Sequence, residues 1–112
     1  QLPPTGEYTA IATVANMFEA LGGLVKSGVI DRDVACDVVA LIVVRNWDAM
    51  LPLTTYVRRK IRAPALWENF EYLALLSKRF IETHPAGAYP RGEPRLPEDD
   101  SLIRALAGNS EA

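Results

Sequence analysis

Three breaks divide this chain into long segments with helical periodicity, and they restrict its fold more than any other feature. Gly28 is followed closely by Asp31, and the other two breaks fall at Pro64 and Pro85. Glycine is common just past the end of a helix, and aspartate is common just before the start of one. A residue that precedes proline avoids the α-helical backbone conformation. The sequence therefore predicts an all-α protein, a small antiparallel bundle of three to four main helices.

The first segment, residues 7–26, has the apolar stripe of an amphipathic helix. Gly22-Gly23 lies inside it at a cost in helix propensity of about 1 kcal/mol per glycine, so we expect these glycines to allow close packing against a neighbouring helix. The stripe consists of Ile11, Val14, Ala15, Phe18, Leu21 and Val25.

The second segment begins after Asp31, a good N-cap residue. Residues 34–44 are apolar nearly all round, which is typical of a helix at the centre of a bundle. Pro52 either kinks this helix or starts a new one, and we expect a kinked or broken helix.

The third segment is predicted as a helix over residues 64–83, with Pro64 as its first residue. Residues 85–97 contain four prolines and two glycines and are typical of an extended linker. A short helix over 98–107, capped by Gly108, should follow. We therefore divide the chain into a bundle domain, residues 1–84, and a linker with a C-terminal helix, residues 85–112, which docks on the bundle or on a partner.

Composition bears on the partners and the compartment. The net charge of -2 argues against nucleic-acid binding, which depends on many cations near phosphates. Cys36 is the single cysteine, which excludes an intramolecular disulfide and suits a reducing compartment. The longest uninterrupted apolar run, residues 38–44, is far shorter than the roughly 18 residues of a membrane span, so we expect no span in this chain.

One charged cluster has two interpretations. This cationic cluster places four cations within five residues: Arg58, Arg59, Lys60 and Arg62. They either stabilise the negative end of a helix dipole or form a site for anionic lipid headgroups or a phosphorylated ligand. Glu68 and Glu71 are expected to pair with this cluster.

Four aromatic residues are predicted as anchors, either of the core or of an interface: Phe18, Trp47, Trp67 and Phe70. We find no catalytic constellation and predict no metal site and no cofactor. His84 lacks a second ligand nearby and is expected to cap a helix, and Cys36 to act as a small buried hydrophobe.

Two runs of the sequence carry a family resemblance: MFEALGGLVKSGVID (17–31) and PALWENFEYL (64–73), with Trp47 and Pro52 between them. They resemble a bacterial family known only as a domain of unknown function. The resemblance covers roughly residues 10–82. It implies a small, mostly helical domain on the cytoplasmic side of the inner membrane, tethered there by an upstream segment that this chain lacks.

These observations predict a non-enzymatic interaction or scaffolding module that forms a homo-oligomer or binds a partner protein through helix contacts. The alternative is a ligand-sensing domain that binds a phosphorylated small molecule or an anionic membrane surface through the cationic cluster.

Overall fold

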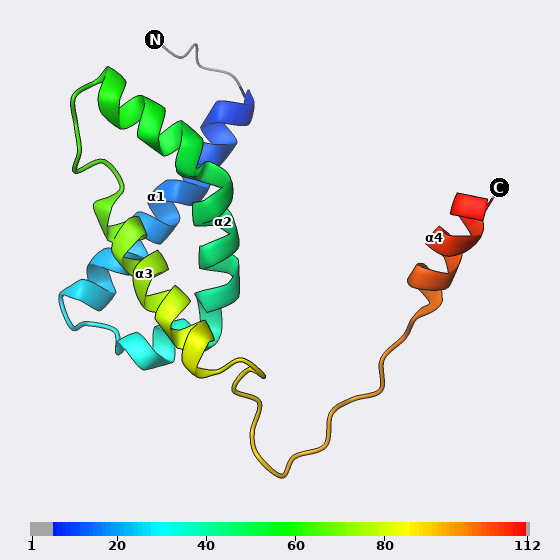
Figure 1. The fold of residues 1–112 in the computed structure, drawn as a ribbon. Coiled ribbons are helices and arrows are strands. Elements are labelled where there is room, and N and C mark those ends of the chain that lie inside the picture. The colour runs from blue at the N-terminus through cyan, green and yellow to red at the C-terminus, as the bar shows by residue number, and fades with distance from the viewer. Residues whose placement is uncertain (1–5, 112) are drawn as a thin grey trace.

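The computed structural model describes residues 6–111 and contains four helices: α1 (Gly6–Lys26), α2 (Arg32–Lys60), α3 (Glu68–Thr83) and α4 (Ser101–Glu111). Figure 1 shows α1, α2 and α3 together as one bundle and α4 apart from it. The predicted all-α class is confirmed. Residues 1–5 and 112, which the predicted domain boundaries include, lie outside the described part.

Helix α3 is the central element of the bundle, because it packs against both α1 and α2 while these two make little contact with each other. Its Phe70 and Leu73 are completely buried. The ring of Phe70 lies 5.2 Å from that of Phe18 on α1 and 5.1 Å from that of Trp47 on α2, the latter edge to face. One aromatic ring thus joins all three helices.

Residues 34–44 were expected at the centre of the bundle, but α3 occupies that position. The segment is helical, but it lies at one side of the bundle and buries a single face. Val34, Val38, Leu41 and Ile42 are exposed. The prediction that this segment is a helix is confirmed. The prediction that it lies at the centre of the bundle is wrong.

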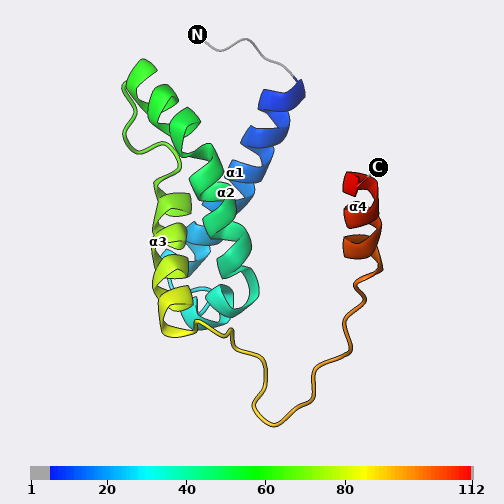
Figure 2. The ribbon, with the colours of Figure 1, turned by 45° about the vertical axis from the view of Figure 1, so that its right-hand side comes forward.

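Helix α2 runs without interruption through Pro52. Proline has no N–H to donate to the carbonyl four residues earlier, and its ring crowds that carbonyl. Figures 1 and 2 show α2 bending along its length, as the kinked alternative predicts. The helix begins at the predicted cap, where the Asp31 side chain accepts a hydrogen bond from the Val34 N–H at 3.0 Å.

The turn between α1 and α2 has the geometry that the sequence indicates. Gly28 has a φ of 83°, a left-handed conformation that glycine adopts without steric cost. The N–H groups of Val29 and Ile30 both donate to the carbonyl of Leu24, so the end of α1 is closed by the following residues.

The prediction that Pro64 starts α3 is wrong, because the helix begins at Glu68. Trp67 occupies the N-cap position with a φ of 57°, in the left-handed region. A bulky residue rarely adopts this conformation, and residues 64–67 form turns ahead of it. The start of α3 is therefore fixed by tertiary contacts of Trp67.

Helix α4 begins later than predicted and extends past Gly108, which is a helical residue and not a cap. Asp99 accepts a hydrogen bond from the Ser101 N–H at 2.9 Å, and Arg104 pairs with Asp100 at 3.2 Å. Within the described chain α4 packs on none of the other helices. The radius of gyration is accordingly 18.0 Å, compared with about 13 Å for a compact domain of about 100 residues.

Candidate functional site

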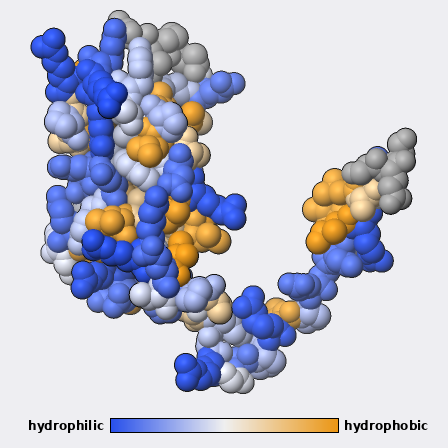
Figure 3. Space-filling model, in the orientation of Figure 1, coloured by the Kyte–Doolittle hydropathy of each residue, from blue (hydrophilic) through white to orange (hydrophobic). Residues whose placement is uncertain are grey.

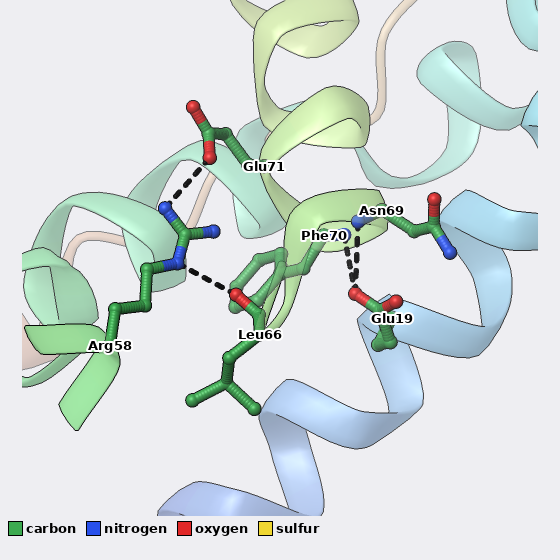
Figure 4. A network of polar contacts seen from close by, with 6 residues as sticks. All are labelled: Glu19, Arg58, Leu66, Asn69, Phe70 and Glu71. Carbon is green, nitrogen blue, oxygen red and sulfur yellow. Dashed lines mark hydrogen bonds and ion pairs between the residues drawn. The ribbon is translucent and has the colours of Figure 1, made fainter. Parts of the chain in front are cut away.

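The N-terminus of α3 is held by side chains from both neighbouring helices (Figure 4). One carboxylate oxygen of Glu19, on α1, accepts hydrogen bonds from the N–H groups of Asn69 and Phe70, each at 3.0 Å. These are the donors that an N-cap side chain normally satisfies. Trp67 has no side-chain acceptor to offer, so Glu19 caps α3 from another helix, and its negative charge suits the positive end of the helix dipole.

Trp67 is fixed in its unusual conformation by its own side chain. The indole is buried, and its Nε1–H donates to the side-chain oxygen of Asn16 on α1 at 3.0 Å. Gly22 lies against the same region, where a Cβ would meet the backbone oxygen of Asn69 at 2.1 Å. The close packing expected for the two glycines is therefore present at Gly22, whereas a Cβ on Gly23 would make only an ordinary contact with the Asn69 side chain.

Arg58, from the cationic cluster, belongs to this junction. Its Nε donates to the Leu66 carbonyl at 2.7 Å, and its Nη1 pairs with Glu71 at 2.9 Å. The guanidinium also lies 5.7 Å from the centre of the Trp47 ring, within the range of a cation–π contact. Arg58 is thus engaged in joining α2 to α3, and the pairing expected for Glu71 is present.

The rest of the cationic cluster lies elsewhere. Arg59 and Lys60 are exposed, and with Tyr56 they line a hollow of about 440 Å³ on α2 beside Pro52. Arg62 is exposed in the turn that follows α2. The structure therefore separates one inward-facing cation from three that face solvent. Glu68 is exposed as well.

The four aromatic anchors, Phe18, Trp47, Trp67 and Phe70, are all buried within the bundle. The structure places them in the core and leaves a different set of large apolar side chains at the surface.

A row of exposed apolar side chains lies on α2. We call Val34, Val38, Leu41 and Ile42 the α2 apolar face; they lie at helical spacing on one side of α2 and are 55–72% exposed. A groove of about 450 Å³ adjoins this face between α2, the end of α3 and the start of the linker. It is lined by Cys36, Val38, Leu41, Ile42, Phe80, Ile81, Pro85 and Ala88, among others.

Two residues predicted as structural border this groove. Cys36 is buried, and burial raises the pKa of its thiol above the ordinary value, so the thiol is in its neutral form at pH 7. His84 ends α3: its Nδ1 lies 2.9 Å from the Phe80 carbonyl, and its ring stacks on Phe80 at 4.1 Å. His84 therefore caps the helix and is one of the residues that line the groove.

Two further features bear on membranes and metals. Among residues 6–111, α1 is long and apolar enough to cross a membrane, a test that the core helix of a soluble protein or a signal sequence also passes. Helix α1 contains no long uninterrupted apolar run, because small and polar residues are interspersed along it.

No group of three or more metal-ligating side chains is gathered within residues 6–111.

Sequence comparison identifies the family. Residues 3–77 match the family described as "Domain of unknown function (DUF4760)", so the chain belongs to this family. The matched region includes α1 and α2 and ends within α3, so the linker and α4 lie beyond it. No curated protein and no solved structure matches the chain at a significant level.

Proposed function

We propose that this member of the DUF4760 family is a non-enzymatic interaction module and that it binds a partner helix through the α2 apolar face. The observation that carries the proposal is the exposure of four large aliphatic side chains on one face of α2. A contiguous exposed apolar surface on a folded domain is a common mark of a protein-binding site.

The shape beside this face suits a helix. The apolar groove between α2 and α3 continues the face toward Pro85, so an amphipathic helix laid along α2 would contact both. Recognition of this kind depends on apolar anchors at three- and four-residue spacing, which fit between the side chains of the receiving helix. The aromatic residues are held in the core, so binding through this face requires no change in the bundle.

Substitution of one residue of the face tests the proposal. Leu41→Asp places a charge within the face, and Met17→Asp makes the same kind of change on α1; both side chains are 58% exposed. We expect the wild-type chain to self-associate in sedimentation equilibrium, Leu41→Asp to be monomeric, and Met17→Asp to behave as wild type. Thermal unfolding would verify that both variants are folded. Equal self-association of the two variants, or a monomeric wild type, would refute the proposal.

The solvent-facing cations support a second candidate function. Arg59 and Lys60 share a hollow with the hydroxyl-bearing residues Thr55 and Tyr56, a combination of donors that suits a phosphate group. We propose weak association of this end of α2 with an anionic membrane surface. Arg58 is omitted from this site because its guanidinium is engaged with Leu66 and Glu71.

The same proposal assigns α1 to the bundle and not to the membrane. Its Asn16 accepts a hydrogen bond from Trp67, the N-cap residue of α3, and its Glu19 accepts hydrogen bonds from the first turn of α3. Phe18 packs on Phe70. Insertion of α1 into a bilayer would break these contacts and leave the polar side chains in hydrocarbon. The bundle then lies on the cytoplasmic side of the membrane, with its cationic end near anionic headgroups.

A further inference from the structure

We propose that the occupant of the α2 apolar face is helix α4 of a second copy of this chain, and that two chains exchange α4 reciprocally. This inference rests on the proposed function and identifies the partner. Leu102, Ile103 and Leu106 form an apolar stripe on α4, and they are 68%, 70% and 57% exposed. Within residues 6–111, exposed apolar side chains thus lie on one face of α2 in the bundle and on the separate helix α4.

Each of the two surfaces is one face of a helix. The α2 apolar face extends over residues 34–42, about 12 Å along the helix axis, and the apolar stripe of α4 extends over residues 102–106, about 6 Å. The stripe of α4 can therefore cover about half the length of the face. In Figure 3 hydrophobic residues are visible at several places on the bundle, including its side toward α4, and those of α4 lie on its side toward the bundle.

Charge determines the direction of docking. The run Glu98-Asp99-Asp100 precedes α4, whereas Asp33 and Asp37 flank the α2 apolar face near the start of α2. Arg45 lies one turn beyond Ile42 at the other end of the face and is exposed. An antiparallel arrangement brings the acidic run to Arg45, and a parallel one brings it to the two aspartates. We infer antiparallel docking.

The linker favours exchange between chains. Prolines fix φ and stiffen an extended segment, and residues 85–97 contain four of them. The middle of the linker is also held in shape: the Tyr89 hydroxyl donates to the Pro94 carbonyl at 2.9 Å, and the Arg95 guanidinium lies over the Tyr89 ring at 4.4 Å. A stiff connection that carries α4 away from its own bundle lowers the effective concentration of α4 at its own α2 face.

Reciprocal exchange also supplies the necessary area. One short helix with three apolar anchors makes a small contact, and stable interfaces bury about 1,200–2,000 Å² in total. Two-fold exchange doubles the contact and closes the assembly, because each chain then donates one helix and receives one. The predicted assembly is a dimer and not an open filament.

The first test removes the apolar stripe of α4 in the full chain. Leu102→Asp combined with Ile103→Asp should weaken self-association at least about tenfold in sedimentation equilibrium, because two buried anchors are lost. Leu96→Asp, in the linker at 86% exposure, is the matched control and should leave self-association unchanged. If the α4 double variant dimerises as wild type while Leu41→Asp does not, α4 is not the occupant and the proposed function stands. If neither variant affects self-association, both proposals are wrong.

The second test distinguishes exchange from docking within one chain. The α4 double variant keeps an intact α2 apolar face, and the Leu41→Asp variant keeps an intact α4. Each alone should be monomeric, and an equimolar mixture should form a one-to-one heterodimer by sedimentation velocity. This heterodimer should be weaker than the wild-type dimer, because it keeps only one of the two exchanged contacts. A mixture that stays monomeric at every concentration, or a monomeric wild type whose α4 amides are protected from exchange, would overturn the exchange. Circular dichroism of each variant would verify its fold before mixing.

Discussion

The contact between α1 and α3 at Gly22 leads to a prediction about two adjacent glycines that differ sharply in their surroundings. A Cβ on Gly22 would lie 2.1 Å from the backbone oxygen of Asn69 and 2.6 Å from its carbonyl carbon. A Cβ on Gly23 would meet only the side-chain nitrogen of Asn69, at 3.4 Å. Both glycines lie in α1, so replacement by alanine favours the helix by up to about 1 kcal/mol in each case.

The clash at Gly22 outweighs that gain. Overpacking typically costs about 1–3 kcal/mol, and here the neighbour is backbone at the start of α3, which Glu19 holds by two hydrogen bonds. Separation of the two helices to accommodate the methyl group would also strain those bonds. We expect Gly22→Ala to destabilise the protein and Gly23→Ala to be neutral or stabilising, a difference of about 2 kcal/mol or more.

Thermal unfolding measured by circular dichroism provides the assay. A difference of about 2 kcal/mol corresponds to roughly 10 °C in Tm for a domain of this size. Gly23→Ala serves as the matched control, because it makes the same chemical change one residue away. A Gly22→Ala variant that melts at or above the Tm of Gly23→Ala would show that the close approach of α1 to α3 is absent in solution.

Three more predictions test the rest of the account. Glu19→Ala should destabilise the protein by about 1–3 kcal/mol in urea unfolding, because the N–H groups of Asn69 and Phe70 lose their acceptor. Glu68→Ala is the control and should have little effect, because Glu68 lies at the same helix end and is exposed. Phe70→Ala should cost about 3–5 kcal/mol, because the ring is completely buried; unchanged stability would contradict its core position. Arg59→Glu with Lys60→Glu should abolish sedimentation with anionic vesicles at low salt, and persistent binding would exclude this site.

Sequence periodicity predicted that the four helices exist, and the turn between α1 and α2 could be predicted because both helix ends there depend on local chemistry. Gly28 and Asp31 define the turn between α1 and α2 through their own backbone and side-chain preferences, and Pro52 bends α2 for a local reason.

The start of α3 could not be predicted from local preference, because its cap comes from Glu19, about 50 residues earlier in the chain. A signal existed: residues 63–67 (APALW) offer no side chain able to cap a helix, so the acceptor had to come from elsewhere.

The α2 apolar face was missed for a different reason. Apolar residues on all sides of a helix indicate burial on all sides, but they fit equally a helix that buries one face in its own bundle and the other against a partner. Sequence periodicity cannot distinguish the two cases. The position of α3 between α1 and α2 does, because it leaves Val34, Val38, Leu41 and Ile42 at the surface.

Hydrogen exchange of the α4 amides at several protein concentrations tests the central claim most directly. An 11-residue helix without packing is marginal in water, so its amides should exchange rapidly in the monomer. If α4 docks on the α2 apolar face of a second copy, protection of residues 101–109 should appear and rise with protein concentration. Fast exchange at every concentration, or protection that does not depend on concentration, would contradict the account.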